Sequence, residues 1–156
     1  MPTNRQLLIA IALTCFALIG AALYLQHAMN MMPCPRCVIQ RYAFIAIGIF
    51  ALLGAFLPKP KVWSGLALIS AIVGGANALK LIDVINHPAM GCGIDPMETM
   101  LNKIPTATML PWLFRADGMC EAAGEPFFML SVPHWSAIWF GLLTAALVMV
   151  LARRAK

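Results

Sequence analysis

Charged side chains are scarce in this sequence of 156 residues, because they make up 11% of it while hydrophobic residues make up 62%. A soluble domain carries about 25% charged residues, so this composition excludes an ordinary water-soluble fold. The chain needs an apolar solvent, and we predict an integral membrane protein. No internal repeat and no low-complexity tract is evident along the sequence.

Other absences narrow the possible functions. Nothing in the sequence resembles a flavin-binding or nucleotide-binding motif. The formal charge is +5, but the basic residues gather at the ends of the apolar runs and form no stripe, which argues against a nucleic-acid partner. Covalent haem attachment requires C-x-x-C-H, whereas Val38 follows Cys37.

Four long apolar runs are present, at about 7–25, 38–57, 63–85 and 136–152. Each is close to the roughly 20 residues that a helix needs to cross a hydrocarbon core of ~30 Å. The first is too long for a signal-peptide core, so we expect a retained anchor. The sequence therefore predicts an all-α four-transmembrane-helix bundle, formed by residues 1–156 as a single integral membrane domain.

Two loops at about 26–37 and 86–135 then lie on the same side of the membrane. The second is long, and its segment 106–115 is apolar and aromatic but too short to span. We expect this segment to form a short helix that lies flat at the interface with the bilayer.

The charges decide the orientation of the bundle. Every Asp and Glu falls towards the side of the two loops, whereas the other side carries Arg5, Lys59, Lys61, Arg153, Arg154 and Lys156. Because short cytoplasmic segments are enriched in Lys and Arg, both termini are expected in the cytoplasm. In a bacterium the loops then face the oxidising periplasm, which predicts a multi-pass protein of the inner (cytoplasmic) membrane.

Four of the five cysteines, Cys34, Cys37, Cys92 and Cys120, lie in or beside these outer loops. Cys34 and Cys37 form a C-x-x-C pair, and nearby arginines favour the thiolate, the nucleophile in thiol–disulfide exchange. We expect Cys37 to begin the second helix, where the helix dipole and Arg41 stabilise an anion. Cys15, in the middle of the first run, is interpreted as a small hydrophobic residue.

Other interpretations of these residues stay open. Both cysteine pairs can be structural, although the small ring between Cys34 and Cys37 gives little stabilisation. A zinc site is disfavoured because the other two cysteines are far apart in sequence, and we expect no metal. Lys80 and Asp83 can share a helical face, either as an interfacial pair or as a polar wall of a ligand site.

Electrons that leave thiols outside the membrane need an acceptor, and a lipid-soluble quinone is the natural one. Cys37 is expected at the depth of a quinone head group. Arg41, one helical turn further on, can donate hydrogen bonds to a quinone oxygen and to the negative charge that develops on it during reduction.

An ordered set of motifs resembles the DsbB family, bacterial inner-membrane proteins that reoxidise the periplasmic dithiol oxidase DsbA at the expense of quinone. The set comprises Pro33-Cys34-x-x-Cys37-x-x-Gln40-Arg41, Cys92-Gly93, Leu110-Pro111-x-x-Phe114-Arg115 and Gly118-x-Cys120-Glu121. The resemblance covers nearly the whole chain. It departs in the third span, where some members carry a histidine near the quinone and this chain has Lys80 and Asp83.

The resemblance implies a role for each cysteine. Cys92 receives the attack of the thiolate of a DsbA-like thioredoxin-fold partner, and Cys120 is its disulfide mate. Cys120 then exchanges with Cys34, and Cys37 passes electrons to ubiquinone or menaquinone with the help of Arg41. The membrane quinone pool in turn connects the protein to the respiratory chain.

Two rival functions remain at this point. A vitamin K epoxide reductase-like protein shares the thiol–quinone chemistry, but its C-x-x-C is expected towards the last helix. A four-span scaffold with structural disulfides is the non-enzymatic rival. It predicts that Cys37→Ser harms folding and removes no activity.

Overall fold

The computed structural model describes residues 2–87 and 96–153. Four long helices form its frame, namely α1 (Asn4–Ala28), α2 (Pro35–Phe56), α3 (Pro60–Asn86) and α7 (Val132–Ala152). All four are long and apolar enough to cross a membrane. The prediction of an all-α four-helix membrane bundle is confirmed.

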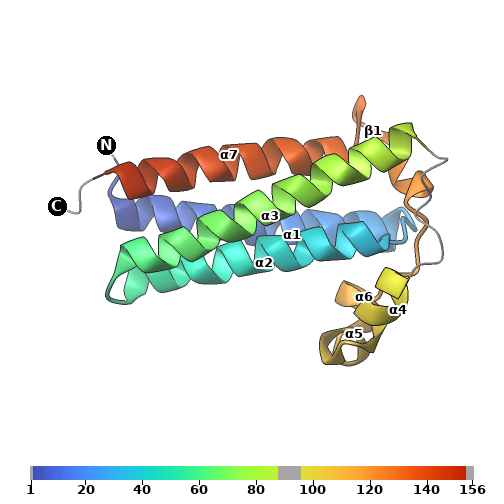
Figure 1. Ribbon diagram of the computed structural model, residues 1–156, viewed down its shortest axis with the longest axis horizontal. Coiled ribbons are helices and arrows are strands. Elements are labelled where there is room, and N and C mark those ends of the chain that lie inside the picture. Colours follow the sequence, from blue (N-terminus) through green and yellow to red (C-terminus); the bar gives the residue numbers. More distant parts are fainter. Residues whose placement is uncertain (1, 88–95, 154–156) are drawn as a thin grey trace.

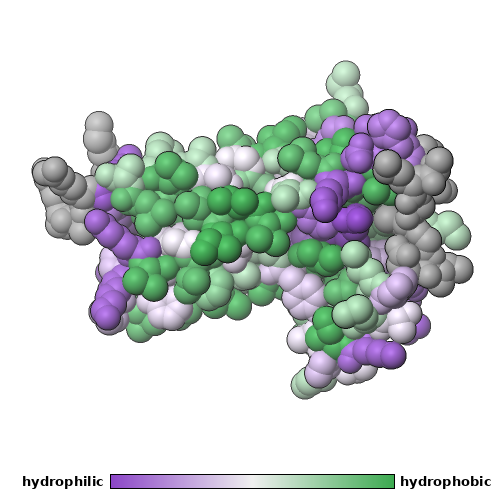
Figure 2. Space-filling model, viewed as in Figure 1, coloured by the Kyte–Doolittle hydropathy of each residue, from purple (hydrophilic) through white to green (hydrophobic). Residues whose placement is uncertain are grey.

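The four helices lie side by side, with the start of α1 and the end of α7 at the same end of the bundle (Figure 1). α2 packs against α1 and α3, and α3 packs against α7, while α1 and α7 contact each other only sparsely. Figure 2 shows hydrophobic side chains along the middle of this face and hydrophilic side chains towards both ends. This distribution matches a protein whose middle faces lipid and whose ends face water.

Proline fixes where three of the four long helices begin. α2, α3 and α7 each carry Pro at one of their first two positions, where its locked φ suits the helix and its missing N–H is not needed. Pro35 therefore starts α2 three residues before the expected Val38. As a result Cys37 lies inside the first turn, and Cys34 becomes the N-cap residue.

Close packing in the bundle depends on Gly74 of α3. A Cβ atom at Gly74 would lie 2.3 Å from Cε1 of Phe140 and 2.8 Å from the Cβ of Ala43. Phe140 cannot easily yield, because it is buried and stacks on Phe44 with ring centroids 4.1 Å apart. Gly74 thus allows α2, α3 and α7 to meet at one level.

Replacing Gly74 by alanine should therefore destabilise the bundle. Overpacking of a tight core costs about 1–3 kcal/mol, and the loss should appear as a lower midpoint of thermal unfolding in detergent. Gly65 on the same helix is the matched control, because a Cβ there meets nothing within 4 Å. Equal midpoints for Gly74→Ala and Gly65→Ala would contradict this view of the packing.

The second loop contains short elements rather than one helix over 106–115. After the undescribed residues come α4 (Pro96–Lys103), α5 (Pro105–Met109) and α6 (Pro111–Phe114), then a 3₁₀ turn η2 (Glu121–Gly124). Pro111 divides α5 from α6, because a residue that precedes proline is disfavoured in the α region, and Leu110 has φ −127° and ψ 64°.

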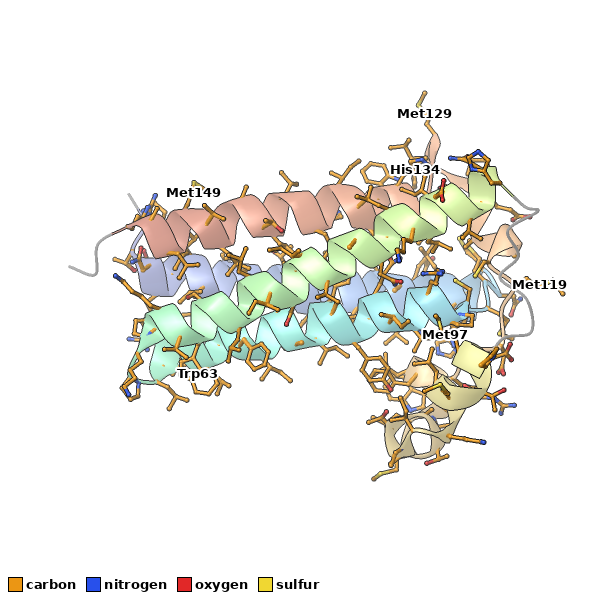
Figure 3. All side chains as sticks on the ribbon, viewed as in Figure 1. Trp63, Met97, Met119, Met129, His134 and Met149 are labelled. Carbon is orange, nitrogen blue, oxygen red and sulfur yellow. The ribbon has the colours of Figure 1, made fainter. Side chains whose placement is uncertain are left out.

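A two-stranded antiparallel hairpin, β1 (Pro126–Phe127) and β2 (Leu130–Ser131), leads into α7. In Figure 1, α4–α6 lie to one side of the bundle and the hairpin extends on the other. Met129 at its tip points away from the helices (Figure 3). The bundle thus carries a projection on either side, both at its loop end.

The short helices are attached to α2 by Tyr42. Its ring stacks on Phe114 of α6, with centroids 4.4 Å apart, and its hydroxyl hydrogen-bonds the hydroxyl of Thr106 on α5. The amide of Asn102 on α4 pairs with both backbone groups of Ala116 at 3.0 and 3.1 Å. These contacts fix the path of the chain just before it reaches Cys120.

Candidate active site

A small buried cluster brings together sulfur atoms from both outer loops. Cys34 at the start of α2 and Cys120 in the second loop pack with Leu81 of α3, and Cys37 lies against them. The cysteines at the centre are almost fully shielded, because Cys34 is 0% and Cys120 is 2% exposed. The structure therefore joins two of the predicted site residues that are far apart in sequence.

A backbone contact holds the two loops in this arrangement. The N–H of Gly118 donates to the carbonyl oxygen of Pro33 at 3.0 Å. A Cβ at Gly118 would lie 2.2 Å from the carbonyl oxygen of Met32, so only glycine fits this close approach. The contact lies one residue before Cys34 and two residues before Cys120, and it sets their separation.

Cys34 and Cys37 are not joined by a disulfide in the structure. The sulfurs of Cys34 and Cys37 are 2.8 Å apart, and the Cys34 sulfur also accepts a hydrogen bond from the backbone N–H of Cys37 at 3.3 Å. Cys120 is disulfide-bonded. Cys92, its expected mate, lies outside the described residues.

Cys34, rather than Cys37, occupies the position that the start of α2 stabilises. The hydrogen bond from the Cys37 thiol lowers the pKa of Cys34, burial opposes this, and the backbone N–H groups of Cys37 and Arg36 lower the pKa further. The expectation that Cys37 begins the second helix is thus corrected. The reason is that Pro35 begins the helix and leaves Cys34 as its N-cap.

The Cys37 thiol should therefore control the ionisation of Cys34. In Cys37→Ala its hydrogen bond is lost, so the pKa of Cys34 should rise and the thiolate should form only at higher pH. The ultraviolet absorbance of the thiolate, followed against pH in the fully reduced protein, measures this change. Cys15→Ala, a change at a buried thiol outside the cluster, should leave the low-pH thiolate signal in place. An unchanged Cys34 signal in Cys37→Ala would rule out the assigned cause.

Asn77 of α3 holds the residue between the two cysteines. Its amide nitrogen donates to the carbonyl oxygen of Arg36 at 2.9 Å, and its amide oxygen accepts from the Arg36 guanidinium at 3.2 Å. Asn77 was not predicted as a site residue, because no local pattern shows which helix faces the C-x-x-C turn. A polar residue among the small residues of an apolar span was the available signal.

Arg41 is a buried cation, 6% exposed. Its Nη1 donates to Oε1 of Gln26 on α1 at 2.8 Å and to the carbonyl oxygen of Leu113 on α6 at 2.7 Å. Gln26 in turn donates to the carbonyl oxygen of Trp112 at 3.1 Å. Arg41 therefore anchors α6 to α1 and α2, a structural role that was not predicted from the sequence.

An apolar cavity of about 870 Å³ adjoins these residues. Cys37 and Arg41 line it from α2, and the other walls come from α1, α7 and both loops, including Leu18, Ile19, Met119, Phe127 and Trp139. This volume lies within the range of small-molecule sites, and such sites combine apolar walls with a few polar groups. The cavity suits a largely apolar molecule that carries a few polar atoms.

Other residues considered from sequence lie apart from this site. Asp83 contacts the exposed His87, with 3.3 Å between Oδ1 and Nδ1, and it forms no ion pair with Lys80 within the described part of the chain. Lys80 and Asp83 do not line the cavity. Cys15 is buried in the apolar core of the bundle, in agreement with its interpretation as a packing residue.

Comparison with known proteins identifies the family to which the chain belongs. The family model for disulfide bond formation protein DsbB matches residues 4–150. The chain belongs to the DsbB family. Disulfide bond formation protein B of Cupriavidus metallidurans is 44% identical over 154 residues, which is 98% of this chain and 96% of that protein.

Further relatives within the DsbB family agree. The protein of the same description from Cupriavidus necator is 47% identical over 98% of this chain and 96% of its own length. That of Herminiimonas arsenicoxydans is 46% identical over 90% of each chain. The DsbB family, rather than a vitamin K epoxide reductase-like family, therefore accounts for the bundle and its cysteines.

Proposed function

We propose that this member of the DsbB family is a quinone-dependent thiol–disulfide oxidoreductase that reoxidises a periplasmic DsbA-like dithiol oxidase of the thioredoxin fold. One observation carries the proposal: Cys120 is buried against the C-x-x-C pair, beside an apolar cavity lined by Cys37 and Arg41. The relatives support it, since each is described as a disulfide bond formation protein B.

The sulfur steps conserve atoms and electrons. A thiolate of the partner attacks Cys92 in a Cys92–Cys120 disulfide, and the second partner thiolate then closes the partner's disulfide and releases Cys92. Cys120 thiolate attacks Cys34 in the Cys34–Cys37 disulfide, and Cys92 resolves the mixed disulfide. Two electrons and the partner's two protons have then reached the C-x-x-C pair.

The cavity residues fit a quinone as the acceptor, either ubiquinone or menaquinone from the membrane pool that serves the respiratory chain. When bound, a quinone accepts two electrons and two protons and leaves as quinol. Arg41 supports this assignment, because no carboxylate in the described part of the chain forms an ion pair with it. A buried cation of this kind favours negative charge that develops nearby. Transfer of the two electrons to the quinone restores the disulfide between Cys34 and Cys37.

The orientation proposed from the charges decides which end of the bundle faces the periplasm. With both termini in the cytoplasm, the sulfur cluster lies at the periplasmic end of the bundle, in the inner membrane. The start of α1 and the end of α7 lie together at the opposite end (Figure 1). A periplasmic partner can then reach the second loop, while quinone reaches the cavity from the bilayer.

The proposal is tested by mixing the purified protein in detergent with a reduced DsbA-like partner and a short-chain ubiquinone, and following quinone reduction spectroscopically. We expect reduction only when all three components are present. Protein whose thiols have been alkylated beforehand is the control for direct reaction between partner and quinone. A folded, quinone-loaded protein that reduces no quinone with several such partners would instead support the scaffold with structural disulfides.

A further inference from the structure

The hairpin that leads into α7 ends in an apolar tip that the described part of the chain leaves uncovered. Phe128 and Met129 form its two-residue turn, and they are 78% and 98% exposed. The whole segment 126–133, Pro-Phe-Phe-Met-Leu-Ser-Val-Pro, contains no charged residue. Adjoining exposed apolar side chains of this size mark an interaction site rather than a turn that faces water.

The backbone of the turn makes these side chains more unusual. Phe128 has φ 49° and Met129 has φ 69°, so both lie in the left-handed region. A two-residue hairpin turn with this backbone favours Asn and Gly, because bulky residues adopt positive φ at a cost in free energy. A phenylalanine and a methionine at these positions indicate that the apolar side chains themselves are needed at the tip.

The helix α7 determines the depth of the hairpin in the membrane. Its 21 residues extend about 31 Å at ~1.5 Å per residue, close to the ~30 Å thickness of a hydrocarbon core. The first turn of α7 therefore lies at one boundary of that core. Because β2 ends at Ser131 and α7 begins at Val132, no linker separates the hairpin from this boundary.

Trp135 holds the hairpin against the start of α7. Its indole Nε1–H donates to the carbonyl oxygen of Phe127 at 3.0 Å, which fixes the base of the hairpin. Tryptophan is enriched where the headgroups of a bilayer meet the hydrocarbon core. From Trp135 the exposed side chains of Ile138 and Leu142 continue along α7 at helical spacing. The hairpin thus adjoins a helix face that meets lipid.

The direction of the hairpin identifies its surroundings. It extends sideways from the bundle at the level where α7 begins (Figure 1), and Met129 points away from the helices (Figure 3). A tip in this place lies among the lipids that surround the protein. A water-soluble protein could reach it only by displacing those lipids, so the observations favour the bilayer as the occupant.

We propose that the tip of the hairpin, formed by Phe128, Met129 and Leu130, inserts into the interfacial layer of the bilayer as an apolar anchor. The anchor lies on the side of the bundle opposite to α4–α6 (Figure 1). It attaches the end of the second loop to the membrane independently of those helices. The loop that carries Cys120 is therefore held at the membrane surface from two sides.

The test compares two methionines of the wild-type protein in lipid nanodiscs of phosphatidylethanolamine and phosphatidylglycerol. Met119 is 75% exposed and lies beyond the loop end of the bundle (Figure 3). From their exposure in the protein alone, Met119 and Met129 should react alike with hydrogen peroxide, a water-soluble oxidant that converts methionine to its sulfoxide. In nanodiscs we expect Met129 to react at least about tenfold more slowly than Met119, as measured by mass spectrometry of peptides.

A photoreactive lipid distinguishes contact with the bilayer from burial within the protein. A phosphatidylcholine that carries a diazirine in the upper part of one acyl chain should, on illumination, label residues 128–130 and leave Met119 unlabelled. Met129→Asp should reduce the labelling of the hairpin several-fold, because a carboxylate is unfavourable in an apolar layer. Met119→Asp is the matched control and should leave the labelling of the hairpin unchanged.

Three results would overturn the anchor. Equal oxidation of Met119 and Met129 in nanodiscs would place the tip in water, and slow oxidation of Met129 without lipid labelling would place it against protein. Protection of Met129 that appears only when a DsbA-like protein is added would make the hairpin a docking site for that partner. None of these results depends on quinone reduction, so the anchor and the proposed function are tested separately.

Discussion

Quinone reduction should fall to the background rate when Cys37 is replaced by serine. The two electrons that reach the C-x-x-C pair can leave only if a disulfide forms again between Cys34 and Cys37, and a serine oxygen cannot form it. The effect is a loss of turnover and not of folding, because Cys37 lies at the edge of the buried cluster and serine is close to it in size.

The same variant should still oxidise its partner once. The proposed Cys92–Cys120 disulfide should be unaltered in this variant, so one equivalent of reduced DsbA-like protein should become oxidised without any quinol being formed. Rapid mixing, acid quenching and thiol labelling measure this single turnover, and Cys15→Ala is the control that should reduce quinone normally. Continued quinone reduction by Cys37→Ser would mean that the electrons follow another route.

A large but partial loss of turnover is expected from Gly118→Ala, at a position that carries no reactive side chain. The new Cβ would lie 2.2 Å from the carbonyl oxygen and 2.8 Å from the carbonyl carbon of Met32. These are backbone atoms that cannot rotate away, so the second loop must move and the hydrogen bond to Pro33 is lost. Cys120 is then displaced from Cys34. Misplacement of a reacting group can slow a reaction roughly tenfold to hundredfold.

The step that becomes slow distinguishes this explanation from a general loss of folded protein. In Gly118→Ala, the first exchange with the partner should proceed at a rate close to that of the wild type, while transfer from Cys120 to Cys34 becomes slow. Single-turnover thiol labelling resolves these steps. Gly141→Ala on α7, where a Cβ meets nothing within 4 Å, is the control. Normal transfer in Gly118→Ala would show that the loop contact does not position the sulfurs.

Much of the fold could be predicted because the bilayer demands it. Long apolar runs and the side of the basic residues depend only on local sequence, so the four spans were found within four residues of the observed helix starts. The break of the interfacial segment at Pro111 was not predicted. The apolar pattern of 106–115 contains no sign of the break, which comes from the backbone restriction that proline places on Leu110.

The site was predicted less completely, for a physical reason. The C-x-x-C pair and Arg41 carry their chemistry in a short motif, and the structure places both beside the cavity. The partnership of Arg36 with Asn77 and that of Arg41 with Gln26 depend on which helices face one another. No periodicity along a single helix contains that information, so these contacts appear only once the bundle is assembled.

The shielding of Cys34 and Cys120 has a consequence for how the protein lives among other thiols. Because water scarcely reaches either sulfur, a small soluble thiol has little access to a disulfide through the sulfur of Cys34 or of Cys120. Under the proposed function, burial at these two atoms favours exchange between the cysteine pairs over exchange with small thiols in solution.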